Sequence, residues 1–588
     1  MIAAVEPDFN AERNLLGSVW NGPGYHSRVP NGTWVHQTRL SIYYALALLD
    51  DGRPEYLERA GKVIRAVLKS QVTDPYDPAY GIWPWLDEEP VAQMAPPDWN
   101  WADFIGSGLC HMLVEHAGKL DAELKREITA ALERAAWSIF RRNIQPNYTN
   151  IALMGAAVTG CAGEILDNAI LREYAKNRLA KFLAYTRETG GINEYNSPTY
   201  TFVALFEVER ILQLVREPET RSHAGELLRL FWNELANHFH PATGQLGGPQ
   251  SRAYGDFLPE DNARFIREAT GVEIPIAAPG KEGEEFCHFT YSGIRHQPCP
   301  PDIAARFARL PEPETEVALR CIRRQPDTHS TYCTTFLNDD FVVGSASVSI
   351  FWIQSRPLLG YWRVPGMEMP AQFRFRFLRD NRDFSSAQLY SRQCRNRILC
   401  GVGLRRDLGD HHPGLDRPAD GVFHFERLAA CFELTGKGAE VSRSPDGTFT
   451  LRLGSTQAVI RPGSGVFSSV PVRWECSSSE TGARVEAVFY AGPSRSELFD
   501  ERTELTLACG VEVLPAGGAS EAGAFTESVG PESVTAAWGG LALEFPRFAQ
   551  KEWWTDILPG VRCGKGKPAV LKTDLARYTH KYLRRSTV

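Results

Sequence analysis

The first half of the chain places apolar residues at the spacing of an α-helix. Apolar residues recur every three or four positions along 57–68, and the segment 121–140 repeats this pattern. Pro, Gly, Asn and Asp occupy the joints, as helix ends require. The predicted helices span residues 37–50, 57–68, 101–117, 121–140, 150–160, 166–187, 199–216 and 220–238. Eight or nine helices with no convincing strand between them predict stacked antiparallel hairpins, and therefore an α/α toroid, complete or open on one side.

The second half changes to a period of two. Apolar and polar residues alternate along 372–377, 448–453 and 485–489, which is the pattern of half-buried antiparallel strands. Many such segments predict a large antiparallel β-sandwich. We therefore expect a multidomain α + β protein. Its predicted parts are a toroid domain that carries the cleft (1–270), a connecting region rich in Pro, Gly and Glu (271–316), the β-sandwich (317–550) and a C-terminal segment (551–588).

Composition narrows the classes of function. The chain has 588 residues and a net charge of -7, so it lacks the basic signature of a nucleic-acid-binding protein. It contains no run of eighteen apolar residues, so we expect no membrane partner. The first residues show no basic region followed by an apolar stretch, which predicts a cytoplasmic location, or a periplasmic or secreted one if a signal was removed. Twelve cysteines without a C-x-x-C pair argue against zinc and a dense disulfide framework, and we expect no metal and no cofactor.

Polar, aromatic-rich clusters occupy residues 97–103, 147–150, 193–200 and 249–256. Those at 147–150 and 193–200 stand at predicted helix starts, and the one at 249–256 lies in a loop between the helical and connecting segments. Asn196 or Ser197 can cap the following helix, and Pro198 suits its first turn. One capping residue does not account for the carboxylate, the tyrosines and the further amides in these clusters. Such turns between apolar helices predict a carbohydrate-binding cleft at one end of the helical array.

Two chemistries on polysaccharides fit these residue types. β-Elimination from a uronic acid needs a group that neutralises the sugar carboxylate, a base and an acid. Asn150, Tyr200, Arg252 and Tyr254 supply those types. Hydrolysis instead needs two carboxylates. The candidates for hydrolysis are Asp98, Asp103, Glu194 and Asp256, and the predicted substrate contacts are Trp99, Asp103, Asn147, Glu194, Asn196 and Gln250.

Structural roles compete with each of these assignments. Asn150, Asn196 and Ser197 are also suitable helix caps, and Tyr200 also fits a core position with its hydroxyl at the rim. A salt bridge between Arg252 and Asp256 would account for both residues without chemistry. A carbohydrate-binding protein without catalysis is therefore a further alternative.

The order of a helical domain and a β-sandwich resembles the toroid-fold polysaccharide lyases, the group that contains heparinase II/III-like, alginate and chondroitin lyases. These lyases use an Asn or Gln neutraliser, a Tyr or His base and a Tyr acid, often with an Arg nearby. The resemblance implies that Asn150 is the neutraliser, Tyr200 or Tyr254 transfers the proton, and Arg252 is the charge partner. Asn150 is followed by Ile151, so the chain lacks the Asn-His dyad that several relatives carry.

The function favoured at this stage is β-elimination in a uronic-acid-containing poly- or oligosaccharide. A glycoside hydrolase of the same fold and a non-catalytic carbohydrate-binding protein remain the alternatives. We also expect the β domain to contribute to the rim of the cleft, because a strand-like segment at 351–357 ends in polar residues. The candidates for this contribution are Tyr332, Gln354, Arg356 and Trp362.

Overall fold

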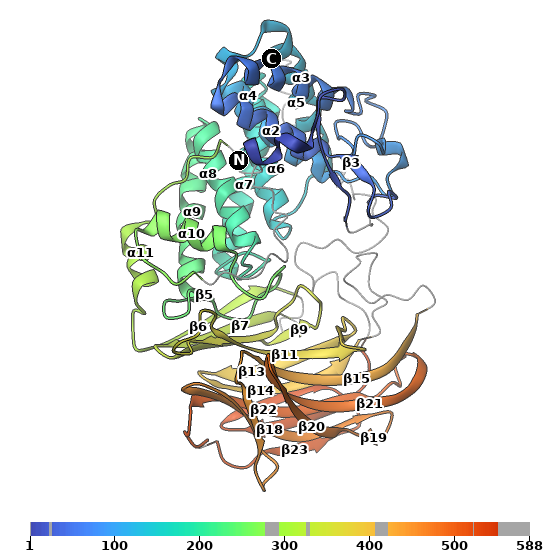
Figure 1. Cartoon of the computed structure of the whole chain (residues 1–588), viewed down its shortest axis with the longest axis vertical. Coiled ribbons are helices and arrows are strands. Elements are labelled where there is room, and N and C mark those ends of the chain that lie inside the picture. The colour runs from blue at the N-terminus through green and yellow to red at the C-terminus, as the bar shows by residue number, and fades with distance from the viewer. Residues whose placement is uncertain are drawn as a thin grey trace, which may run out of the picture.

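The protein consists of a helical region followed by a region of antiparallel sheets, as Figure 1 shows for the helices in the upper part and the strands in the lower part. This order confirms the predicted fold class. The computed structural model describes residues 2–22, 26–276, 293–324, 330–405, 421–520 and 522–550. The predicted C-terminal segment, 551–588, lies outside the described residues.

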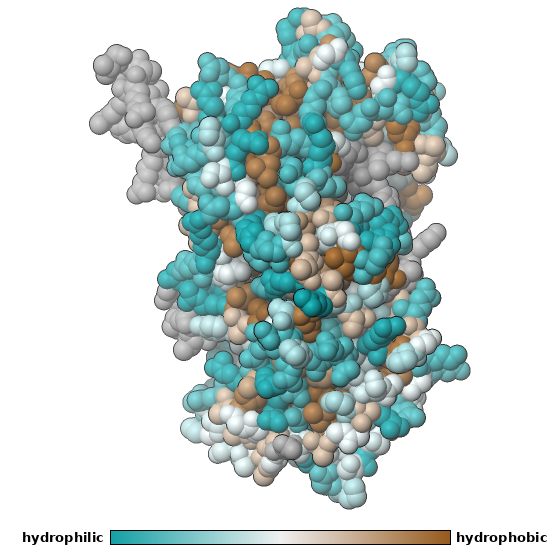
Figure 2. Space-filling view, turned by 90° about the vertical axis from the view of Figure 1, so that its left-hand side faces the viewer, coloured by the Kyte–Doolittle hydropathy of each residue, from teal (hydrophilic) through white to brown (hydrophobic). Residues whose placement is uncertain are grey.

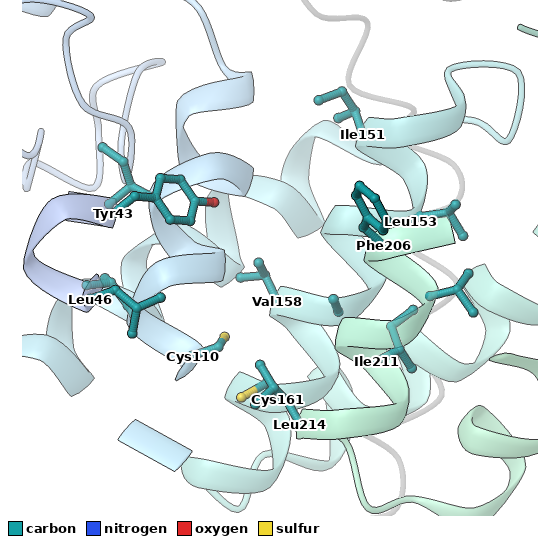
Figure 3. Packing of buried hydrophobic residues seen from close by; sticks show 14 of the residues in the cluster. Tyr43, Leu46, Cys110, Ile151, Leu153, Val158, Cys161, Phe206, Ile211 and Leu214 are labelled. Atoms are coloured by element: carbon teal, nitrogen blue, oxygen red, sulfur yellow. The ribbon is translucent and has the colours of Figure 1, made fainter. Parts of the chain in front are cut away.

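Four helices form the inner layer of the toroid. They are α2 (Thr38–Asp51), α4 (Asn100–Glu115), α6 (Thr149–Ile165) and α8 (Tyr200–Leu214), and they neighbour one another in that order. In α6 every residue from Thr149 to Gly163 is buried, because other helices cover all sides of it. Figure 3 shows side chains of this layer lying between the helices, among them Tyr43, Cys110, Val158 and Phe206.

Four outer helices each follow an inner one and bury a single stripe. They are α3 (Pro54–Lys69), α5 (Ala122–Arg142), α7 (Ala169–Thr189) and α9 (Pro218–His238). In α3 the buried residues are Ala60, Val63, Ile64 and Val67, which are spaced as one helical face. The four hairpins α2–α3, α4–α5, α6–α7 and α8–α9 match the predicted helical segments.

Short elements accompany the toroid and depart from the expectation of an all-helical segment. Strands β1 (Phe9–Asn10), β2 (Leu15–Val19) and β3 (Trp34–His36) form a small sheet, and β4 (Phe239–His240) pairs with β5 (Gln245–Leu246). The short helix α10 (Glu260–Thr270) follows the hairpins, and α11 (Pro301–Ala308) lies within the predicted connecting region. Helix α1 (Ile2–Val5) precedes the first sheet.

Two large sheets form the sandwich. They contain the strands predicted around 372–377, 448–453 and 485–489. The first sheet runs in the order β20 (Arg473–Ser479), β21 (Gly482–Leu498), β15 (Val422–Thr435), β11 (Ala371–Arg379), β10 (Leu358–Trp362), β8 (Phe341–Ala346), β7 (Thr331–Asn338) and β6 (Glu314–Ile322), with β12 (Arg382–Asp383) beside β11. The second runs in the order β16 (Glu440–Arg443), β17 (Phe449–Leu453), β18 (Thr456–Phe467), β22 (Leu505–Pro515), β14 (Arg397–Leu404), β13 (Ala387–Cys394) and β9 (Val348–Ile350), with β19 (Val470–Pro471) beside β18.

The core of the sandwich lies between these two sheets. Phe373, Phe375 and Phe377 alternate along β11 and point into this core, while the arginines between them point to the other side. A smaller sheet packs on the outer face of the second sheet through Trp538 and Phe545, so the β region has a third layer. That sheet consists of β23 (Thr526–Val529), β24 (Ser533–Trp538) and β25 (Leu541–Pro546).

Loops of the toroid rest on the outer face of the first sheet. Gly248 lies against Gly344 of β8, where a Cβ would stand 1.8 Å from the Gly248 carbonyl oxygen. Gln250 and Arg356 exchange both backbone hydrogen bonds, at 3.0 and 2.9 Å, so residue 250 pairs with the β region like a strand residue. The two regions are therefore joined at the loop end of the helices.

The surface and the described helices can be compared with the sequence expectations about membranes and metal ions. One face of the molecule is mostly hydrophilic, with hydrophobic residues in short stretches between polar ones (Figure 2). Among the described residues, no helix is both long enough and apolar enough to cross a bilayer. In the same part of the chain, no group of three or more His, Cys, Asp or Glu residues is arranged to hold a metal ion.

Candidate active site

Two loops of the toroid meet where the helices face the first sheet. The loop before α8 contains Asn196, whose backbone is left-handed with φ of 44°. The Asn196 side-chain amide donates to the carbonyl oxygens of Gly247 and Pro249, the latter at 2.9 Å. Ser251 donates from its hydroxyl to the Tyr195 carbonyl oxygen at 2.8 Å. These bonds hold the clusters 193–200 and 249–256 side by side.

Ser197 connects the start of α8 with the second loop. Its hydroxyl oxygen accepts the backbone N–H of Tyr200 at 2.9 Å, and its hydroxyl donates to the Arg252 carbonyl oxygen at 2.5 Å. Ser197 thus binds the first N–H of α8, although the N-cap position is Thr199, which has no side-chain cap, and the Asn196 side chain ties the loops together. The same contact fixes Tyr200 and Arg252 relative to each other.

Arg252 is the centre of the polar cluster. Its Nη1 donates to Glu194 Oε1 at 3.1 Å, and its Nη2 donates to the Tyr254 hydroxyl oxygen at 3.1 Å. The Tyr254 and Tyr200 hydroxyls are 2.7 Å apart. The guanidinium also lies over the Tyr200 ring, 4.4 Å from its centroid. The predicted salt bridge to Asp256 is absent from these contacts, because Arg252 pairs with Glu194 instead.

The residues of this cluster differ in how far they are exposed to solvent. Glu194 is fully buried and Tyr200 and Arg252 nearly so, whereas Tyr254 is 43% exposed. Burial raises the pKa of Tyr200 well above its ordinary value, although Arg252 acts in the opposite direction. Burial also raises the pKa of Glu194 to about 7, again against the attraction of Arg252. Tyr254 is therefore the exposed member of this cluster.

The β region completes the cluster. Gln354 Oε1 accepts from Arg252 Nε at 3.1 Å and from Nη2 at 3.0 Å. The Trp352 ring faces the guanidinium, with its centroid 5.5 Å away. Of the residues expected at the rim, Gln354 makes this direct contact, whereas Trp362 is buried in the sandwich core and donates to the Leu453 carbonyl oxygen. Trp352 was missed by sequence reasoning, because a tryptophan in an apolar strand pattern does not differ from a core residue.

Asn150 lies at the start of α6 beside the same carboxylate. The Asn150 backbone acts to lower the pKa of Glu194, against the larger effect of burial. The Asn150 side chain is 7% exposed, and its buried Oδ1 has no hydrogen-bond partner within the described part of the chain. Its side-chain amide therefore has hydrogen-bonding capacity that the protein itself does not use.

Known proteins give a broad match to this architecture. A family model described as a domain of unknown function (DUF8769) matches residues 9–263, and no curated protein matches the chain. Among solved structures, heparinase III is 9% identical, with 87% of this chain and 83% of that chain covered and a TM-score of 0.42. Chondroitin AC lyase from Streptomyces coelicolor A3 is 11% identical, with 91% and 82% covered and a TM-score of 0.46. A structure called "Glycoside hydrolase" is 11% identical, with 86% and 77% covered and a TM-score of 0.27.

The other predicted substrate contacts have varied surroundings. Asn196 and Gln250 are buried and use their amides on loop carbonyl oxygens, and Gln250 Nε2 donates to Leu246 O at 2.9 Å. Trp99 donates from Nε1 to the Pro78 carbonyl oxygen at 3.1 Å. Asn147 is exposed, and its carbonyl oxygen accepts from Asn193 at 3.3 Å. The substrate-binding role of each of these residues stays a prediction.

The carboxylates proposed for hydrolysis are held in internal contacts. Asp103 is buried 3.7 Å from Arg142, and burial raises its pKa to about 7. Asp98 is buried and accepts from Trp85 Nε1 at 3.1 Å. Asp256 binds Arg374 at 2.6 Å and Arg356 at 3.4 Å. Glu194 is fully buried, whereas the Asp256 side chain is 45% exposed.

Proposed function

We propose that the protein is a lyase that cleaves a uronic-acid-containing poly- or oligosaccharide by β-elimination. The observation that carries this proposal is the environment of the Tyr254 hydroxyl. Arg252 Nη2 lies 3.1 Å from the Tyr254 oxygen and the Tyr200 hydroxyl lies 2.7 Å from it, while the Tyr254 side chain remains 43% exposed. A phenol that is bound to a cation and reaches solvent has the surroundings of a group that exchanges protons with a bound sugar.

The two tyrosines have different roles in this proposal. Burial raises the pKa of Tyr200, so Tyr200 keeps its proton, and its hydroxyl lies 2.7 Å from the Tyr254 oxygen. Arg252 donates to the same oxygen. Tyr254 therefore stands beside a cation and a second hydroxyl, and we assign the proton transfer to it.

The reaction follows from these positions. The Asn150 amide hydrogen-bonds to the uronate carboxylate and makes the proton on the adjacent carbon more acidic. Tyr254 takes this proton, the electron pair of the broken C–H bond forms the C=C double bond, and the glycosidic C–O bond breaks. The leaving oxygen receives that proton from Tyr254, which ends the cycle in the state in which it began. The products are an unsaturated uronate and a new reducing end.

A screen of uronic-acid polysaccharides tests the proposal. Alginate, polygalacturonate and chondroitin, with their oligomers, are incubated with the enzyme, and ultraviolet absorbance and reducing ends are measured in parallel. We expect both signals to rise together for at least one substrate. Reducing ends without absorbance would establish hydrolysis instead. Silence in both assays across the panel, with binding retained, would indicate a non-catalytic binding protein.

A further inference from the structure

A second polar feature lies on the outer face of the first sheet. A cavity of about 470 Å³ opens where β11, β15, β21 and β20 lie side by side. This volume is within the range of about 300–1,000 Å³ that is usual for small-ligand pockets. The cavity is lined by Arg374, Arg376, Glu433, Leu434, Thr435, Ser477, Ser478, Ser479, Thr481, Gly482, Ala483 and Arg484.

Strand register explains why these polar residues share one face. Arg374 stands opposite Glu433, Glu433 opposite Arg484, and Arg484 opposite Ser477. Directly opposed residues of neighbouring strands point to the same side of a sheet, so these four form one row across four strands. Because Phe373 and Phe375 point into the sandwich core, the row faces outward.

Arginines outnumber carboxylates in the lining of this cavity. Glu433 is the carboxylate of the lining, and it pairs with Arg484 at 2.6 Å, Arg376 at 3.0 Å and Arg374 at 3.2 Å. Burial raises the pKa of Glu433, but the arginines outweigh this effect and keep the pKa below its ordinary value. Glu433 therefore stays ionised and gathers three guanidinium groups. Asp383 also binds Arg376 at 2.8 Å and Asp256 binds Arg374 at 2.6 Å, and the three guanidinium groups carry more N–H donors than these three carboxylates accept.

Further groups complete a site for a hydroxylated anion. Arg374 Nε is buried and has no hydrogen-bond partner among the residues described. Ser477, Ser479 and Thr481 are hydroxyl-bearing residues of the lining, and Ser477 stands on the outward-facing row opposite Arg484. Guanidinium groups bind carboxylates and sulfates through paired N–H donors, and hydroxyls suit the ring oxygens of a sugar.

The same row of residues continues under the candidate active site. On the near side of Arg374 it runs through Leu359 and Gly344, which the toroid loop covers at Gly248. Arg374 also donates to Asp256 at 2.6 Å, and Asp256 belongs to the loop that carries Arg252 and Tyr254. Arg374 therefore connects the cavity with the loop 249–256 of the candidate active site.

We infer that this cavity is a binding subsite for a carboxylate or sulfate group of an acidic saccharide, separate from the tyrosine–arginine cluster. The inference rests on the proposed function in one respect, since it takes the ligand to be an acidic glycan. The subsite binds the charged group through Arg374 and Arg484 and the neighbouring hydroxyls through the serines of β20.

Direct binding tests this subsite. An unsulfated oligouronate and a sulfated chondroitin oligosaccharide are titrated into the Tyr254→Phe variant, with a neutral maltooligosaccharide as the reference ligand. We expect Arg484→Gln to weaken binding of at least one acidic probe about tenfold, since charge-assisted hydrogen bonds are lost. The probe that responds more strongly identifies the group as carboxylate or sulfate. Arg452→Gln is the matched control, because Arg452 is about equally exposed and pairs with Glu440 at 2.6 Å in the second sheet.

A second variant keeps every arginine in place. Ser477→Asp adds a negative charge opposite Arg484, and we expect it to abolish acidic binding, whereas Ser442→Asp on β16 does not. Wild-type affinity in both Arg484→Gln and Ser477→Asp overturns the subsite, even if elimination is observed. Conversely, acidic binding that depends on Arg484, without elimination by the wild type, retains the subsite and rejects the lyase.

Discussion

Tyr254 is the residue on which the proposed chemistry depends most directly. Tyr254→Phe removes the hydroxyl that contacts Arg252 and Tyr200 and keeps the ring. Loss of a positioned acid–base group lowers turnover by about 10²–10⁴-fold, and we expect kcat for elimination to fall within this range. Tyr76→Phe, at a tyrosine that is 94% exposed, serves as the control. Unchanged kcat in Tyr254→Phe would reject the tyrosine mechanism.

Glu194 is expected to act through Arg252 and not on the substrate. Because burial raises the pKa of Glu194 to about 7, its carboxylate forms near neutral pH and then orients the guanidinium. We expect wild-type activity to rise through about pH 7, and Glu194→Gln to be less active and to lack this rise. The measurement is kcat against pH for both proteins. A rise of the same size in the variant would remove Glu194 from this role.

Sequence reasoning found the residues of the cluster but not their pairing. Tyr200, Arg252 and Glu194 were selected because polar and aromatic residues exceeded what helix capping requires. The structural alternative for Arg252 was a salt bridge to Asp256, four positions away, whereas its partner is Glu194, 58 positions away. Separation in sequence does not determine distance in space once two loops are tied together, so this pairing required the structure.

At the scale of elements, long periodic segments were predicted well and short ones were not. The inner helices are apolar on most sides and the outer ones carry a clear stripe, so both types were recognised. Strands β1 to β5 contain two to five residues each. So few positions show too little alternation to be separated from a turn.

The contact between the toroid loop and the first sheet can be tested at Gly344. A Cβ there would stand 1.8 Å from the Gly248 carbonyl oxygen, so Gly344→Ala must push the loop away from β8. Overpacking costs about 1–3 kcal/mol, and we expect a loss of at least this size in the free energy of unfolding, with reduced activity.

Urea denaturation gives the measurement for this variant. Gly225→Ala is the control, because nothing lies within 4 Å of the added Cβ in α9, and alanine stabilises a helix by about 0.5–1 kcal/mol relative to glycine. Equal stability of Gly344→Ala and the wild type would show that the loop does not pack against β8 as described.

At the scale of the whole molecule, two sets of buried groups oppose each other in the dependence of stability on pH. Buried carboxyls with pKa values raised to about 7 bind more protons in the folded state, so their contribution falls as pH rises from about 4.5 to 7. Buried histidines with pKa values lowered to about 4 bind fewer protons when folded, so their contribution rises between about 4 and 6.5. The carboxyls are Asp103, Glu194 and Glu234, and the histidines are His111, His238 and His240.

Glu234→Gln removes one of the buried carboxyls that make stability fall as pH rises. Glutamine resembles the protonated form, so the stability of the variant relative to the wild type should increase from pH 5 to pH 8. The urea midpoint of both proteins at the two pH values provides the measurement. Glu226→Gln, at an exposed position on the same helix, should give a small and pH-independent difference. A pH-independent difference for Glu234→Gln would contradict the prediction.

The backbone pairing of Gln250 with Arg356 limits where a chimera between the helical and β regions of related proteins can be joined. Residues 250 and 253 precede the end of the helical part of the sequence, yet their main-chain bonds run to residues 356 and 354. A chimera joined near residue 270 would thus separate the Arg252 loop from the sheet that shapes it. A junction before Gly247, or exchange of the loop together with the 351–357 segment, keeps that unit intact. A chimera that keeps this site must therefore exchange the loop together with the sheet segment that it contacts, and not the toroid alone.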